Sequence, residues 1–148
     1  MAQDSAGSGF AAALAELQTT GKQSHWIWYI FPQLTGLGSS SAARMFAISG
    51  ESEARDYLRD QVLRARLLKA SEAVLDRLND GLPLRRVMGS EIDVLKLVSS
   101  LTLFERVAEG LGASEPDCAK LRAVATQVLK HAEEQGYSRC AFTLAALP

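Results

Sequence analysis

The chain has 148 residues, 47% of them hydrophobic, and carries 16 Lys and Arg against 17 Asp and Glu, a formal net charge of −1. This length suits one domain that buries its own core without disulfides or structural metals. The balanced charge argues against a surface for nucleic acid or for anionic membranes.

The two cysteines, Cys118 and Cys140, have no metal-ligand spacing. This pattern is typical of buried thiols in a reducing compartment, and a disulfide between them is the weaker interpretation. The first residues do not resemble a signal peptide, and no apolar run is long enough to cross a membrane. We therefore expect a cytoplasmic protein with no metal site and no cofactor, whose Ser/Gly-rich residues 1–9 are frayed.

The first predicted helix begins at Phe10, because Phe10, Leu14 and Leu17 are spaced by four and three residues, and it ends at residues 19–21. Residues 24–33 follow, with both tryptophans of the chain. We expect a helix of about two turns here, with Ser24 as N-cap and an end at Pro32. A strand is the alternative, but no other segment resembles a partner strand.

A loop rich in glycine and serine, residues 33–41, precedes a short helix containing Met45 and Phe46. A further helix is predicted to begin at Ser52. The apolar periodicity then predicts four helices of different lengths, over about 61–78, 84–88, 94–108 and 116–135.

The helix over 61–78 is expected to keep Arg64 in solvent. A last helix from about Ser138 is expected to bury Cys140, Phe142 and Leu144. With no internal repeat and no linker, the pattern predicts an all-α protein in which residues 1–148 form a single compact domain.

His25 is a candidate acid–base residue at the start of the aromatic segment. A lone histidine beside tryptophan is more often a packed, hydrogen-bonded group than a base, and no triad or metal partner is visible in the sequence.

A polar stripe follows the predicted helix over 94–108, since Asp93, Lys96 and Ser100 are spaced by three and four residues and Ser99 and Thr102 by three. One interpretation is a surface ion pair between Asp93 and Lys96, worth well under about 1 kcal/mol. The other is a polar edge that faces a confined pocket, because short hydroxyl side chains replace the long charged ones typical of a solvated face. The sequence does not decide between them.

Gly36, Gly38, Ser39 and Ser40 precede a predicted helix and could bind an anion through backbone amides. A tight turn followed by an N-cap is the favoured explanation, because no nucleotide-binding fingerprint is present.

Two blocks of the chain, with the Gly36–Ser40 segment between them, resemble the family called domain of unknown function 1810: residues 22–34, KQSHWIWYIFPQL, and residues 93–104, DVLKLVSSLTLF. The resemblance implies a compact, mostly helical, cytoplasmic protein without a settled activity. Some bacterial members carry the label calpastatin, a disordered inhibitor whose composition differs from that of this chain. Family members usually begin with an additional helix, which is expected to be absent here because Ala2-Gln3 stand at the start. The resemblance also places Cys140 where the family has an aspartate.

These observations lead to the hypothesis of a pocket between the aromatic segment and the Asp93 helix, binding a small ligand with a flat ring and an anionic group, such as a nucleotide or an ADP-ribose derivative. The order of elements is also similar to that of the ADP-ribose-linked family NADAR. His25 and Asp93 are the acid–base candidates. The expected ligand-binding residues are Trp26, Trp28, Tyr29, Gln33, Gly36, Gly38, Ser39, Ser40, Lys96, Ser99, Ser100 and Thr102.

Two alternatives stay open. The aromatic and glycine-rich surface could be a protein-interaction module without catalysis, or the aromatic block could simply be core. The sequence makes no prediction of oligomeric state, and whether the protein is an enzyme is left open.

Overall fold

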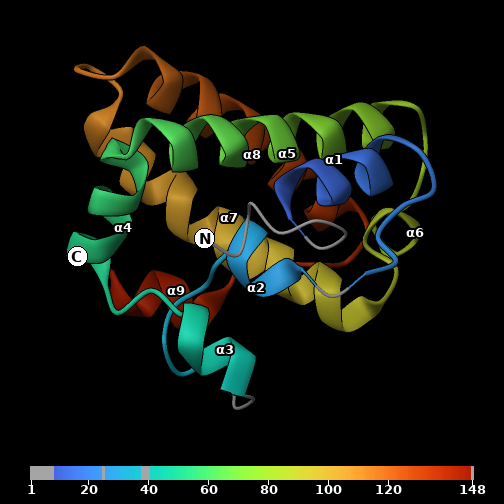
Figure 1. Ribbon diagram of the computed structural model, residues 1–148, viewed down its shortest axis with the longest axis horizontal. Helices are drawn as coiled ribbons and strands as arrows, with labels where there is room; N and C mark the ends of the chain where they lie inside the picture. Colours follow the sequence, from blue (N-terminus) through green and yellow to red (C-terminus); the bar gives the residue numbers. More distant parts are fainter. Residues whose placement is uncertain (1–8, 25, 38–40, 148) are drawn as a thin grey trace.

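The computed structural model describes residues 9–24, 26–37 and 41–147, and these ranges form an all-α fold (Figure 1). The helices are α1 (Phe10–Gln18), α2 (Ile27–Ile30), α3 (Ser41–Phe46), α4 (Glu51–Arg59), α5 (Gln61–Asn79), α6 (Leu84–Met88), α7 (Glu91–Leu111), α8 (Pro116–Glu134) and α9 (Ala141–Ala146). Extended pairing in this part of the chain is limited to one isolated parallel bridge between Leu34 and Ile48.

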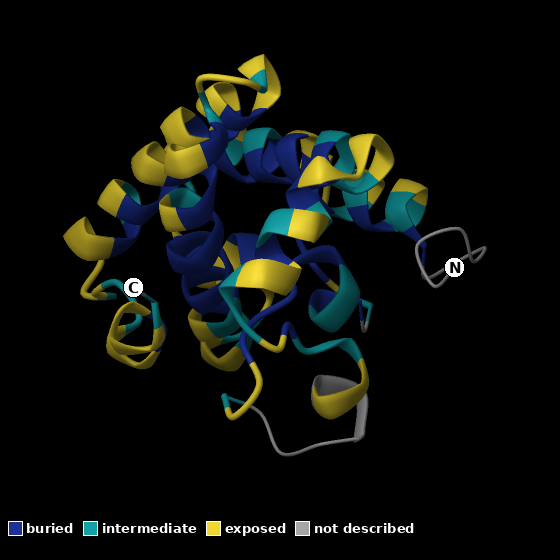
Figure 2. Cartoon of the chain, turned by 90° about the vertical axis from the view of Figure 1, so that its left-hand side faces the viewer, coloured by how far each residue is buried: buried dark blue, intermediate teal, exposed yellow. Residues whose placement is uncertain are grey.

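The central element is α7, which packs against α8, α4, α6, α9 and α2. Figure 1 shows α5 and α8 side by side, with α1 against α5. Buried residues face the interior of this assembly and exposed residues lie on its outside (Figure 2). Because α7 is buried on most of its sides from Val94 to Leu111, even its hydroxyl-bearing residues are enclosed.

The ends of the long helices follow from local chemistry. The Asp60 carboxylate accepts hydrogen bonds from Val62 N and Leu63 N, both at 3.0 Å, at the start of α5. Ser90 caps α7 in the same way, with its Oγ 3.2 Å from Asp93 N. Pro116 lies in the first turn of α8, where its missing N–H costs no helical hydrogen bond.

Two helices in the first half of the chain begin at other residues than predicted. The aromatic helix begins at Ile27 rather than after Ser24, because the Ser24 N–H donates to the Glu16 carboxylate on α1 and the segment before Trp26 is held there in a non-helical form. The fourth helix begins at Glu51, one residue before the predicted start.

The prediction that Arg64 lies in solvent was also wrong, since this residue is only 7% exposed. Its guanidinium donates to Leu58 O at 2.9 Å and lies 3.7 Å from carboxylate oxygens of both Glu115 and Asp117. Arg64 therefore joins the end of α4 to the start of α8 through α5.

The last helix differs from its prediction because it begins at Ala141 and buries Thr143 instead of its large apolar residues. Phe142 and Leu144 are 48% and 38% exposed, and Cys140 is half-buried. Both cysteines carry free thiols. None of the described helices combines the length and the apolar character that crossing a bilayer requires.

Candidate functional site

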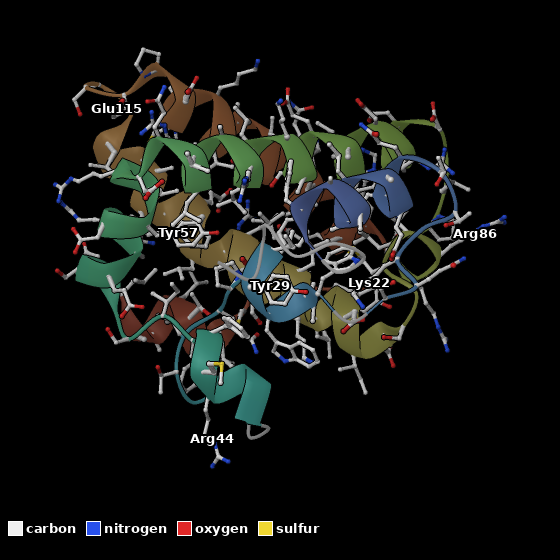
Figure 3. The ribbon with its side chains drawn as sticks, in the orientation of Figure 1. Lys22, Tyr29, Arg44, Tyr57, Arg86 and Glu115 are labelled. Carbon is white, nitrogen blue, oxygen red and sulfur yellow. The ribbon has the colours of Figure 1, made fainter. Side chains whose placement is uncertain are left out.

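The coil between α1 and α2 is anchored by a buried lysine. Lys22 is 8% exposed, and its Nζ lies 2.7 Å from both Ser24 O and an Asp93 carboxylate oxygen. The same ammonium lies 5.1 Å from the centre of the Trp26 ring. Figure 3 shows Lys22 in this coil, beside α2 with its labelled Tyr29. The coil is thereby tied to the first turn of α7.

Glu16 on α1 holds the same coil from the other side. One of its carboxylate oxygens accepts hydrogen bonds from Gln23 N at 2.7 Å, Ser24 N at 2.9 Å and Trp26 Nε1 at 3.1 Å. Burial opposes ionisation of this carboxyl, but the bonds from Ser24, Gln23 and Trp26 outweigh it and lower the pKa of Glu16 to about 2.

This pKa gives a testable pH dependence of stability. Because the folded-state pKa of Glu16 lies below its usual value of 4.5, the ionised carboxylate stabilises the fold above about pH 4.5, and this contribution is lost as the pH falls toward 2. With allowance for solvent screening we expect Glu16→Gln to lower the free energy of unfolding by about 1–2 kcal/mol at neutral pH. Urea unfolding at several pH values should show the wild-type and Glu16→Gln curves converging near pH 2. A difference that is constant from pH 7 to pH 2 would contradict this role of the charge.

Trp26 and Ile27 are core residues, because both side chains are buried. The expected role of Trp26 in stacking on a ligand was therefore wrong. Trp26 is fully buried, with its ring centre 6.3 Å from that of Phe31. Tyr29 is half-buried and meets the ring of Phe46 edge-on at 5.2 Å. The interpretation of the aromatic block as core holds for most of its length.

Trp28 and Lys96 form the boundary between this core and the surface. The Lys96 ammonium lies 4.6 Å from the centre of the half-buried Trp28 ring and 4.0 Å from the second carboxylate oxygen of Asp93. Asp93 thus contacts both Lys22 and Lys96. The contact with Lys96 is the ion pair that one interpretation of the sequence predicted, and the contact with Lys22 was not predicted. The closer partner of Asp93 is Lys22, and this contact makes Asp93 an anchor for both cations.

A surface groove of about 370 Å³ borders Lys96, and we call it the Lys96 groove. Its apolar wall consists of Leu37, Ile92, Leu95 and Val98. Its polar residues are Gln33, Lys96, Ser99, Ser138 and Cys140. Three separate segments, at residues 33–37, 92–99 and 138–140, meet here.

Gln33 is placed in the groove by the short bridge that follows α2. Its backbone carbonyl accepts a hydrogen bond from Ile48 N at 2.8 Å, and Thr35 N donates to Ile48 O at 2.9 Å. Gln33 is only 7% exposed, it borders the groove, and no described residue hydrogen-bonds to its carboxamide. The carboxamide atoms are not among the fully buried polar atoms without a partner, so they reach solvent at the groove and can hydrogen-bond to water or to a molecule bound there.

The polar stripe of α7 is divided between groove and core. Ser99 borders the groove and donates to Leu95 O at 2.9 Å. Ser100 and Thr102 are fully buried, so the expected contact of these two residues with a ligand was wrong. Thr102 instead donates to Val98 O at 2.7 Å and accepts from Cys140 N at 3.2 Å.

Other predicted site residues lie elsewhere or outside the described ranges. Gly36 is packed against the ring of Phe142, whose Cζ would lie 3.0 Å from a Cβ at this position. Gly36 does not border the groove. His25, Gly38, Ser39 and Ser40 lie outside the residues that the structure describes.

The sequence reasoning missed several groove residues. Ile92 and Leu95 are 66% and 52% exposed. They are three residues apart, on the side of α7 away from its apolar stripe, and this spacing was the signal that could have found them. Ser138 and Cys140 reach the groove only through tertiary packing. Within the described ranges, no group of three His, Cys, Asp or Glu residues is arranged to hold a metal.

Comparison with known proteins supports the fold and gives no activity. A family model described as "Protein of unknown function (DUF1810)" matches residues 1–113. The chain is also similar to the conserved hypothetical protein Rv1873 from Mycobacterium tuberculosis, a crystal structure with 32% sequence identity and a TM-score of 0.76. That similarity covers 93% of this chain and 87% of the other. No curated protein matches the chain.

Proposed function

This chain belongs to the DUF1810 family of proteins of unknown function, and we propose that it binds a small anionic ligand with a flat apolar part in the Lys96 groove. The observation that carries the proposal is the nearly buried Gln33 carboxamide, which faces the groove with no hydrogen-bond partner among the described residues. A partly buried cation lies beside it. Free thiols at both cysteines support a location in the cytoplasm.

The dimensions and lining of the groove fit a small molecule. Its volume of about 370 Å³ lies at the lower end of the range for ligand pockets. Leu37 and Val98 on the apolar wall suit one face of a ring, and the few polar groups would set its orientation. The groove suits a nucleotide-sized ring system better than a long chain.

Lys96 is the anion-binding group in this proposal. Its side chain is 21% exposed, so its ammonium keeps some contact with the groove while the Trp28 ring and Asp93 hold it in place. Trp28 therefore positions the cation and does not stack on the ligand. A phosphate or carboxylate on the ligand would meet Lys96, and a donor or acceptor on its ring would meet Gln33. Nucleotides and ADP-ribose are the first classes to test.

The geometry favours binding over an assigned reaction. Asp93, expected as an acid–base residue, already contacts Lys22 at 2.7 Å and Lys96 at 4.0 Å. Its role here is to position Lys96, so we propose no catalytic step that depends on it.

The proposal is tested by titrating AMP, ADP and ADP-ribose while tryptophan fluorescence and melting temperature are recorded. Lys96→Met keeps the aliphatic stem but removes the charge, and we expect it to weaken binding by about tenfold. Lys130→Met is the control, because it removes the same charge from an exposed position on α8 that does not border the groove. Equal affinities in wild type and Lys96→Met would contradict the role of Lys96.

The alternative function, a protein-interaction module, is favoured by one observation. Ile92 and Leu95 expose more than half of their surface beside the groove. Ile92→Ser with Leu95→Ser would remove this apolar edge while leaving Lys96 in place. No response to any of the three nucleotides, together with a partner that co-purifies with wild type and is lost in this double variant, would favour the module.

A further inference from the structure

Cys140 has a fixed position on the Lys96 groove. Its backbone N–H donates to Thr102 Oγ1 at 3.2 Å, and Thr102 in turn donates to Val98 O on α7. The preceding residue, Arg139, makes two hydrogen bonds of 2.9 Å to the Glu105 carboxylate and contacts Glu133 on α8. The thiol therefore lies at a defined point on the wall of the groove.

The surroundings of Cys140 favour its thiolate. Burial opposes ionisation, but the polar groups around the sulfur, first the hydroxyls of Ser99 and Thr143 and then the backbone N–H groups of Thr143 and Phe142, hold the pKa of Cys140 below its usual value. Thr143 is fully buried, and its hydroxyl makes no hydrogen bond to any other nitrogen or oxygen atom of the described residues. The thiolate is the acceptor that this hydroxyl lacks.

The charged groups around Cys140 do not oppose this. Lys96 borders the same groove, and the neighbouring Arg139 is neutralised by Glu105 and Glu133. The other cysteine has the opposite environment: Cys118 is fully buried, and burial raises the pKa of its thiol. The chain thus contains its own unreactive reference thiol.

A half-buried cysteine alone would not define a site, but this one shares its groove with the Lys96 ammonium and with the Gln33 carboxamide, to which no described residue hydrogen-bonds. The three groups belong to three different segments of the chain. A ligand bound by Gln33 and Lys96 would lie against the sulfur of Cys140.

We propose that Cys140 is a reactive thiol that forms a mixed disulfide with an anionic low-molecular-weight disulfide held in the Lys96 groove. The thiolate attacks one sulfur of the bound disulfide, a bond forms between that sulfur and Cys140 Sγ, and the other half of the small molecule leaves as a thiolate. The incoming disulfide is the oxidant, and no other redox partner is needed. The inference rests on the proposed function, since it uses the same groove and the same cation.

The experiment compares two aromatic disulfides, the anionic dithiobis(nitrobenzoate) and the neutral dithiodipyridine, by the absorbance of the released thiolate near about pH 6, where an ordinary thiol is mostly protonated. We expect one equivalent to be released rapidly from the folded protein, lost in Cys140→Ser and retained in Cys118→Ser. Mass spectrometry of the wild type identifies the labelled cysteine, so the assignment does not depend on the folding of either variant.

The charge requirement is tested with Lys96→Met, which should slow the reaction of the anionic probe by about fivefold and leave the neutral probe unchanged. Lys96→Arg should restore most of the rate, and Lys130→Met should not change it. Reaction at Cys118, or a rate at Cys140 no faster than that of the urea-unfolded chain, would overturn the inference.

The two proposals fail separately. If Cys140 reacts rapidly but its rate with the anionic probe is unaffected by Lys96→Met, Lys96 does not bind the anion. The proposed class of anionic ligands would then be contradicted. A Cys140 that does not react, in a protein whose nucleotide affinity depends on Lys96, would leave the proposed function standing and overturn this inference.

Discussion

Gly89→Ala should lower the free energy of unfolding by at least about 4 kcal/mol, a large effect for a single added methyl group. Gly89 ends α6 with a φ of +84°, which an alanine adopts only at a cost. A Cβ at this position would also lie 2.5 Å from Lys22 O. The Lys22 oxygen belongs to the backbone and the Cβ is fixed to the backbone of residue 89, so neither atom can move away without separating α6 from the coil that carries Lys22.

Gly81→Ala is the matched control for this prediction. Gly81 has a similar φ of +92°, but no atom lies within 4 Å of the Cβ that it would acquire. It should therefore cost only the conformational strain, about 1–2 kcal/mol. Urea unfolding followed by circular dichroism measures both variants. If the two substitutions cost the same, the close approach of Gly89 to Lys22 is not what holds this junction.

Lys22→Met should lower the free energy of unfolding by about 3 kcal/mol, because it leaves the Asp93 carboxylate without its 2.7 Å partner. The Lys22 side chain is 5% exposed and that of Asp93 is 17% exposed, so water cannot fully replace the lost ammonium. The remaining cation, Lys96, lies 4.0 Å from the other oxygen of Asp93. The Ser24 carbonyl would also lose its charged donor.

A double variant separates the loss of charge from the loss of packing. Adding Asp93→Asn to Lys22→Met removes the unpaired charge and should recover part of the lost stability. Lys130→Met, at an exposed position, should change stability by less than about 0.5 kcal/mol. A Lys22→Met variant as stable as Lys130→Met would show that the buried ion pair is not needed for folding.

The candidate site was predicted only in part. Lys96 and Ser99 from the polar stripe and Gln33 from the aromatic segment border the groove. Trp26, Ser100 and Thr102 do not, because they are fully buried. Spacing along a helix tells which residues share a face, but it does not tell whether that face meets a groove or another helix, and α7 meets helices on most of its sides.

The sequence by itself determined the family and where most of the helices lie, because apolar spacing and terminating glycines act within a few residues of each other. The apolar stripes that the periodicity predicted are buried on α5 at Leu67, Ala70, Val74 and Leu78, and on α7 at Val94, Leu97, Val98, Leu101, Phe104 and Ala108. The resemblance in residues 22–34 and 93–104 lies within the family match.

Only the tertiary structure decided the burial of charged groups and the composition of the groove. Arg64 and Lys22 are both buried because a carboxylate from a distant part of the chain reaches each of them. A backbone carbonyl only a few residues away, Leu58 O for Arg64 and Ser24 O for Lys22, accepts a further hydrogen bond from each. Cys140 likewise meets Lys96 and Gln33 at one groove because distant parts of the chain pack together. Such contacts depend on how whole helices pack against one another. The packing is determined by the burial of all their apolar faces together, so no local sequence pattern reveals it.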